Sequence, residues 1–323
     1  MDEALIGSML ASTLRVSTPL VLCALAGLFS ERSGVVDIGL EGKMLFAAFA
    51  AGATGAVYSS TALAMAAAVG VGMALSWLHG VACVSYRGDQ VVSGVAVNIL
   101  ASGMTSVLGI AWFAQGGQTP PLDAHVRLQP LLSAGTQATW DTMPTVARVM
   151  CVAFLTHNGL TYCSLALVPA VWWLMYRTRF GLRLRAVGEN PQMVDAAGVS
   201  VQKLRYAALT INGALCGLAG SYLVLAQGAN FSRDMTAGRG FMALAALIFG
   251  RWRPFATLCA CLLFGFLDAA AIRLQGVSVP GLPEIPVQFI QALPYLMTVV
   301  LLAGIGGKSV APAALGKPYV KER

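Results

Sequence analysis

The sequence predicts an all-α fold, a polytopic transmembrane helical bundle of about nine spans, within a range of roughly eight to ten. The 323 residues are 57% hydrophobic and only 11% charged, whereas soluble domains carry about 25% charged residues. The stretch from Met44 to Tyr86 contains no Asp, Glu, Lys or Arg, which is enough for two crossings because one crossing takes about 20 apolar residues. The 35 glycines favour close helix contacts in lipid, since small residues let backbones approach.

Each long apolar run predicts one span. The first run lacks the basic start and the small-residue cleavage site of a signal peptide, so we expect it to be a retained helix. The run at 238–250 is short for a crossing, and 144–158 could instead enter the membrane, which leaves the count open by one. The expected spans are 10–29, 35–58, 61–84, 91–114, 160–177, 204–227, 238–250, 254–272 and 286–306.

The positions of the basic residues predict the orientation. Six of the 21 Lys and Arg residues lie between Arg177 and Arg205, and others occur at 251–253 and in the C-terminal tail. Cytoplasmic loops carry an excess of Lys and Arg, so we expect the C-terminus in the cytoplasm and the acidic N-terminus outside. The net charge of +7 is then explained by membrane topology, and no nucleic-acid partner is expected.

A single transmembrane domain is expected over residues 1–323, with two longer connections. The connection at 115–160 has balanced charges and is expected to be an external loop, with some helix after Pro144. The connection at 178–203 is basic and is expected to lie in the cytoplasm.

A short helix with both ends marked is expected inside this cytoplasmic segment. Asn190 is a good N-cap residue, Pro191 fits the first helical position, and Gly198 suits a left-handed residue just past the end. A helix of about two turns, held between two spans, is suited to transmitting motion to or from a cytoplasmic partner.

No residue pattern points to catalysis or to a bound cofactor. The seven cysteines show no metal-ligand spacing and are expected to act as small apolar fillers. The three histidines are far apart, and no segment matches the phosphate-binding pattern G-x-x-x-x-G-K-[ST]. The sequence therefore predicts a chain that is not an enzyme and holds neither ATP nor a metal itself.

Two carboxylates near the second span are candidates for a transport pathway. Asp37 and Glu41 are four residues apart and would share one helical face, and nearby glycines would loosen the helix there. Ionisable groups at membrane depth are costly and usually face a cavity or a partner. The alternative is structural: the same charges would lie at the cytoplasmic mouth, either solvated or paired with Arg32 and Lys43.

Three further polar residues lie within apolar runs. Asn98 and Asn212 are mid-span amides that would either bind a polar solute or tie two helices together, the second being the commoner use. Asp268 lies late in its span, where it would face either a cavity or external solvent.

Several segments together resemble a known family. They are SERSGVVDIGLEGKML at 30–45, AVGENP at 186–191 with AAGV at 196–199, and GRGFMALAALIFGRW at 238–252 with Pro254. The segments VSGVAVNIL at 92–100 and LPYL at 293–296 add support. In this order they resemble permease subunits of ABC importers, in the nucleoside and simple-sugar branch of the ribose and branched-chain amino acid permease superfamily. The resemblance extends from about residue 14 to about residue 306.

The resemblance implies an assembly in the bacterial inner membrane. Two permease subunits, often different chains, would work with two cytoplasmic ATPase subunits and an extracytoplasmic substrate-binding protein. ATP and Mg would be held by the ATPase subunits and no cofactor by this chain. The solute would be a nucleoside or a related small polar molecule.

The resemblance also assigns the short cytoplasmic helix to coupling with the ATPase. The residues implied are Gly188, Glu189, Asn190, Pro191, Met193, Val194, Ala197 and Gly198. Met193, Val194 and Ala197 would supply apolar contact, and the surrounding arginines would meet acidic groups. The chain departs from the family at Asp37, where many relatives carry Asn, and this departure assigns no substrate by itself.

Other transport and non-transport classes remain as alternatives. The solute could be a simple sugar such as a pentose or hexose. A stand-alone ion-coupled carrier is disfavoured because no mid-membrane charge relay is visible and because the cytoplasmic helix is capped. An integral membrane enzyme is disfavoured because no catalytic constellation is present.

Overall fold

The computed structural model describes residues 3–132, 144–274, 292, 296 and 310–320. The regular secondary structure of the described part is helical, apart from an isolated β-bridge between Pro130 and Asn158. The helices are α1 (Glu3–Arg32), α2 (Leu40–Tyr58), α3 (Thr61–Gly80), α4 (Gln90–Phe113), α6 (Thr145–Leu155), α7 (Gly159–Arg177), α8 (Arg179–Glu189), α9 (Pro191–Ala196), α10 (Val201–Tyr222), α11 (Arg239–Phe249) and α12 (Pro254–Leu274). Two π-helical turns, η1 (Val81–Ser85) and η3 (Leu223–Gln227), extend α3 and α10.

Six described helices are long and apolar enough to cross a membrane: α1, α3 with η1, α4, α7, α10 with η3, and α12. Each corresponds to one of the nine expected spans. Of the other three, α2 is a helix of 19 residues that carries Glu41 and Lys43 in its first turn, and α11 has only 11 residues. The ninth expected span, 286–306, lies outside the described residues except for isolated positions.

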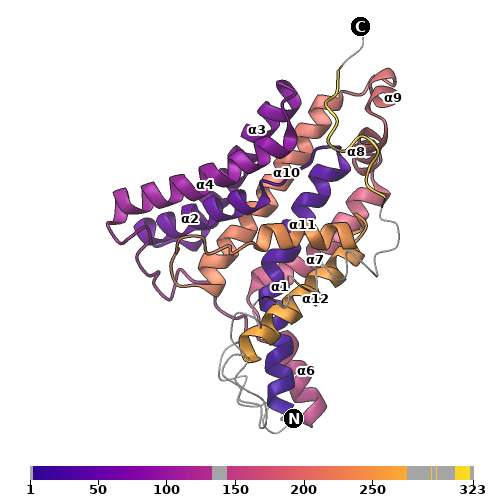
Figure 1. The fold of residues 1–323 in the computed structure, drawn as a ribbon. Helices are drawn as coiled ribbons and strands as arrows, with labels where there is room; N and C mark the ends of the chain where they lie inside the picture. The colour runs from indigo at the N-terminus through magenta and orange to yellow at the C-terminus, as the bar shows by residue number, and fades with distance from the viewer. Residues whose placement is uncertain (1–2, 133–143, 275–291, 293–295, 297–309, 321–323) are drawn as a thin grey trace.

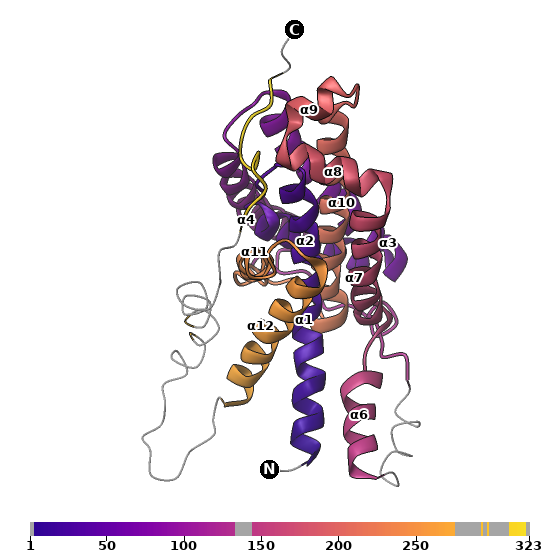
Figure 2. The same ribbon diagram turned by 90° about the vertical axis from the view of Figure 1, so that its right-hand side faces the viewer.

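Helices α1 and α10 form the centre of the bundle. The most apolar stretch of α1 is 67% buried and that of α10 is 78% buried, against 22% for α4. In Figure 1, α2, α3 and α4 extend to one side of this central pair, while α7, α11 and α12 lie on the other. Turned by 90°, α12 and α7 flank α1, and α6 runs beside its N-terminal half (Figure 2).

Glycines explain how closely α10 approaches α3. A β-carbon at Gly213 would collide with the backbone of Gly72 and Met73, and one at Gly217 would collide with the backbone of Val69. Only residues without a side chain allow this spacing, as is common between helices in lipid. The glycine content noted in the sequence therefore has a specific use in the core.

The two ends of the chain lie at opposite ends of the bundle (Figures 1 and 2). The N-terminal turn of α1 and helix α6 share one end, while α8, α9 and the C-terminal segment 310–320 share the other, called the α9 end below. Helix α6 begins directly after Pro144, as expected for the connection at 115–160.

Candidate functional site

Helix α9 has the caps that the sequence predicts. The side-chain oxygen of Asn190 accepts a hydrogen bond from the N–H of Met193 at 3.1 Å, and Pro191 is the first helical residue. At the other end Gly198 has a φ of +78°. The N–H groups of Gly198 and Val199 return to the carbonyls of Asp195 and Val194 at 2.9 and 3.2 Å, which is the Schellman arrangement. The predicted helix and both of its ends are confirmed.

Helix α9 has one buried residue and an exposed outer face. Val194 is only 8% exposed and packs in a small cluster with Val187 of α8 and Val201 of α10. Met193 is 71% exposed, and Ala197 is exposed as well. Because Val194 is buried against α8 and α10, it anchors α9 to the bundle. Met193 is largely exposed and is available to a partner.

The end of α8 is joined to the C-terminal segment and to the end of α1. The carbonyl of Gly188 accepts from the N–H of Ala314 at 2.8 Å, and a carboxylate oxygen of Glu189 accepts from the N–H of Ala313 at 3.3 Å. A β-carbon at Gly188 would collide with the carbonyl of Arg32. Gly188 therefore acts by allowing close packing between α8 and the last residue of α1.

A buried ion pair lies where the 33–39 connection enters α2. Lys43 donates a hydrogen bond to Asp37 at 2.5 Å, and neither side chain is exposed. The Oδ1 atom of Asn212 on α10 accepts from Lys43 at 3.1 Å and from Ser76 on α3 at 2.9 Å. Its amide nitrogen donates to the hydroxyl of Ser30 at 3.4 Å. The cluster thus joins α1, α2, α3 and α10 through polar groups that satisfy one another.

Both carboxylate oxygens of Asp37 accept hydrogen bonds. The N–H of Gly39 donates to Oδ1 at 3.2 Å, and the ammonium of Lys43 donates to Oδ2.

The 33–39 connection is also fixed from the side of α3 and α4. The side chain of Asn98 accepts from the N–H of Gly42 at 2.8 Å and donates to the carbonyl of Ile38 at 3.1 Å. Gln90 accepts from the N–H of Val36 at 2.6 Å, and the ring of His79 lies 3.1 Å from the carbonyl of Val36. These side chains satisfy backbone groups that the irregular segment leaves without helical partners.

Arg205 joins the same connection to the C-terminal segment. The residue is 1% exposed, and its guanidinium donates to the carbonyl of Ser33 at 3.2 Å and to the carbonyl of Lys317 at 3.5 Å. The N–H of Gly316 donates to the carbonyl of Gly34 at 3.2 Å. The 33–39 connection, the C-terminal segment and the end of α8 are thus one hydrogen-bonded unit at the α9 end.

Glu41 and Asp268 have different surroundings. The two carboxylate oxygens of Glu41 accept from the N–H groups of Gly238 and Gly240, at 2.8 and 2.5 Å, so Glu41 caps the N-terminus of α11 from outside that helix. Asp268 is half-buried on α12 and interacts electrostatically with Arg239. The structure therefore brings Asp37, Asn98 and Asn212 to one connection. It brings Glu41 and Asp268 to the start of α11, Glu41 through hydrogen bonds and Asp268 through the charge of Arg239.

The sequence pattern did not single out His79, Gln90 and Arg205 as partners of the 33–39 connection. They lie 43, 54 and 172 residues from their partners in it, and no local spacing marks such pairs. Within the described residues, no group of His, Cys, Asp and Glu side chains has the arrangement of a metal site.

These features define a class of protein: a multi-span helical membrane protein that presents a capped, anchored short helix at one end. The family model described as the permease component of the branched-chain amino acid transport system matches residues 9–303. The chain belongs to this family and is the membrane-spanning permease subunit of an ABC importer. It is a transport subunit and not an enzyme, and such a permease works together with an ATPase and other transporter components.

Named relatives match this chain over nearly its full length. "Nucleoside ABC transporter permease protein NupC" of Lactococcus lactis is 36% identical, over 97% of this chain and 96% of its own. "Guanosine ABC transporter permease protein NupQ" of Bacillus subtilis is 35% identical, over 96% and 95%. "Putative glucose ABC transporter permease protein TsgC13" of Haloferax volcanii is 34% identical, over 97% and 98%.

Each of these three organisms also has a second permease that matches this chain more distantly. They are NupB of L. lactis at 24% identity, NupP of B. subtilis at 28% and TsgB13 of H. volcanii at 26%. This chain covers 74–78% of the length of each of them.

Proposed function

We propose that this chain carries nucleosides inward across the inner membrane of a bacterium, as one half of a permease made of two different chains. The support for a nucleoside is that the relatives at 36% and 35% identity are named for nucleosides and for guanosine. A simple sugar is the second candidate, because the relative at 34% identity is named for glucose. The two solute classes share the hydroxyl-bearing ring that a polar pathway would recognise.

The second permease is proposed to be a different chain. In each of three organisms one permease matches this chain at 34–36% identity along nearly its full length, and another matches at 24–28%. This chain is thus similar to one member of each pair, and an unlike partner would supply the other member. A cytoplasmic ATPase pair and an extracytoplasmic binding protein complete the proposed assembly.

Coupling to the ATPase is proposed to run through α9. Met193 and Ala197 would dock on the ATPase from the exposed face of the helix. Val194 would contribute by anchoring α9 to the bundle, since it is buried. Asn190, Pro191 and Gly198 would fix the length of the helix, and Gly188 and Glu189 would join its movement to the C-terminal segment.

The candidate residues for the solute pathway differ in how exposed they are. Asp37 and Asn212 are 0% exposed, so we propose that they act by holding the 33–39 connection in place. Glu41, Asn98 and Asp268 are each partly exposed, so they are the residues proposed to reach a solute. The two termini lie at opposite ends of the bundle (Figure 1). We propose that the α9 end faces the cytoplasm, because it carries the arginine-rich segment.

The test is ATP hydrolysis and solute uptake by the complete transporter in liposomes. The chain is purified with its natural partners and supplied with the binding protein loaded with guanosine, other nucleosides, a pentose or glucose. We expect nucleosides to stimulate hydrolysis and to accumulate inside. Stimulation by glucose alone would replace the nucleoside with the sugar, and uptake without any ATPase would reject the coupled mechanism.

A further inference from the structure

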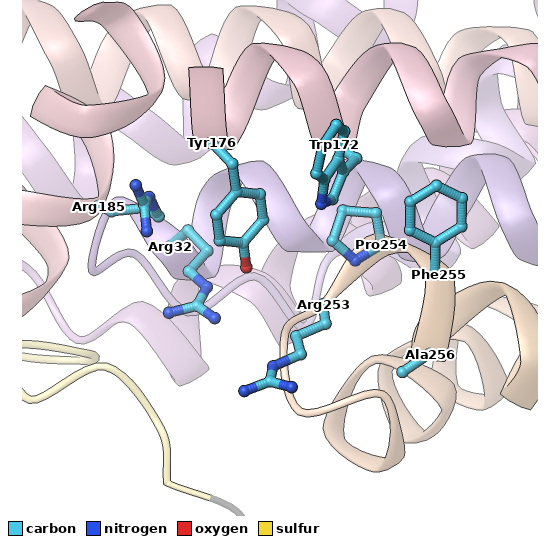
Figure 3. A pocket seen from close by; sticks show the side chains of 8 residues that line it. All are labelled: Arg32, Trp172, Tyr176, Arg185, Arg253, Pro254, Phe255 and Ala256. Carbon is cyan, nitrogen blue, oxygen red and sulfur yellow. The ribbon is translucent and has the colours of Figure 1, made fainter. Parts of the chain in front are cut away.

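A basic hollow at the ends of three spans is not used by the proposed transport function. It has a volume of about 600 Å³ and is lined by Arg32, Trp172, Tyr176, Arg185, Arg253, Pro254, Phe255 and Ala256. This volume is within the range of small-molecule sites. Figure 3 shows the three guanidinium groups on one side of the hollow and the rings of Trp172 and Phe255 on the other.

The hollow lies where three candidate spans begin or end, which is where a membrane boundary is expected. The candidate span of α1 ends at Arg32, that of α7 ends at Arg177, and that of α12 begins at Pro254. Trp172 precedes Tyr176 by one turn of α7, and Phe255 follows Pro254 into α12, so the apolar end of the hollow points along the spans. Tryptophan and tyrosine are enriched at this depth of a membrane.

The three arginines converge with one carboxylate near them, because Glu189 also acts electrostatically on Arg32. Arg32, Arg185 and Arg253 are close enough for Arg185 and Arg253 to act electrostatically on Arg32, and among the described residues none of the three forms an ion pair. Arg32 donates twice to the carbonyl of Trp252, at 3.2 and 2.9 Å. The guanidinium carbon of Arg185 lies 4.5 Å from the centre of the Tyr176 ring.

One donor in this cluster is left without a partner. The Nε atom of Arg185 is buried and makes no hydrogen bond within the described part of the chain. A buried unpaired donor costs free energy unless a ligand or water satisfies it. Because it belongs to a cluster of three positive charges, the ligand that suits it is an anion with several acceptor oxygens.

We propose that this hollow binds the phosphate headgroup of an anionic phospholipid. The three arginines would hold the phosphate, and the lipid's glycerol and first acyl carbons would lie against Trp172 and Phe255, whose ring centres are 6.2 Å apart. Along the spans the charged arginines are followed by an apolar surface, in the same order as the phosphate and the acyl chains of a lipid. A soluble anion would need only the arginines. Basic pockets between spans bind such headgroups in other membrane proteins.

The experiment uses the permease with its co-purifying partners in detergent, titrated with short-chain phosphatidylglycerol and, separately, phosphatidylcholine. Bound lipid is counted by native mass spectrometry. We expect phosphatidylglycerol to bind more tightly than phosphatidylcholine. Arg185→Gln and Arg253→Gln should each weaken phosphatidylglycerol binding about fivefold, and the double variant should weaken it about thirtyfold. Arg251→Gln is the matched control, because Arg251 is exposed in the same turn but does not line the hollow.

Four results would overturn the proposal. The first is equal binding of the two lipids, and the second is an equal loss in Arg251→Gln. The third is inorganic phosphate displacing the lipid at the concentration where phosphatidylglycerol binds, which would mean that the hollow recognises a free anion. The fourth is loss of the co-purifying ATPase with lipid binding unchanged, which would assign the arginines to that partner. Arg253 is exposed, so its variant is expected to fold even if the Arg185 variant does not.

Discussion

Lys43 donates a hydrogen bond to Asp37 across 2.5 Å, and both side chains are completely buried. Removing one partner of a buried pair leaves an uncompensated charge, which costs about 3–5 kcal/mol. We expect Lys43→Met to lower the free energy of unfolding by that amount, measured by denaturant titration in detergent. Asp37→Asn should cost less, because Lys43 still has the oxygen of Asn212 nearby.

The double variant separates the pair from its surroundings. Lys43→Met combined with Asp37→Asn should cost less than Lys43→Met alone, since no unpaired carboxylate remains. A cost for the double variant equal to the sum of the two single-variant costs would show that the two side chains do not stabilise each other.

Glu41 provides a second prediction, because it accepts from two N–H groups at the start of α11. Glu41→Ala should lower stability by about 1–3 kcal/mol, the cost of leaving buried donors unpaired. Glu41→Gln should cost less, because one side-chain oxygen remains to accept a bond. Thermal unfolding in detergent gives the comparison.

Transport kinetics then separate the two roles of Glu41. If it only caps α11, Glu41→Gln should leave the KM for solute unchanged. A change in KM with normal stability would instead support direct contact with the solute, as proposed for Asn98. Asn98→Ala is the parallel test, scored by the same pair of measurements.

Gly188 is expected to tolerate no side chain. A β-carbon there would meet the carbonyl of Arg32, which is main chain and cannot move aside, so Gly188→Ala should cost about 1–3 kcal/mol through overpacking. Gly70→Ala is the control, because a β-carbon at Gly70 of α3 has open space around it. That variant should be neutral or slightly stabilising, since Ala is the better helix former. Equal losses in both variants would contradict the packing argument.

Helix α9 could be predicted from the sequence because its signals are local. Asn190, Pro191 and Gly198 act within a few residues of themselves, so their positions alone mark the start and end of the helix. The structural interpretation of the Asp37 segment pairs its carboxylates with Arg32 or Lys43, and the structure shows this pairing for Asp37 with Lys43 but not for Glu41. Six of the nine expected spans also correspond to helices that are long and apolar enough to cross.

The partners of these residues could not be predicted, because they come from distant parts of the chain. Asn212 is separated from Lys43 by 169 residues, and Glu41 from Gly238 by 197. A carboxylate that caps a helix from another element has the same sequence signature as one that faces a pathway. The sequence predicts that Met193, Val194 and Ala197 all supply apolar contact to a partner. In the structure Val194 is buried while Met193 is exposed, so the three residues do not act alike.

That difference between two adjacent residues tests the proposed coupling. Met193→Glu puts a charge on the exposed face of α9, so we expect at least a tenfold loss of ATPase binding with normal amounts of permease, measured by co-purification and by ATP-driven uptake. Met193→Leu should keep both activities because it keeps an apolar side chain of similar volume. Val194→Glu should instead reduce the amount of folded permease, since it buries a charge among Val187 and Val201. Normal ATPase binding by Met193→Glu would remove α9 from the interface.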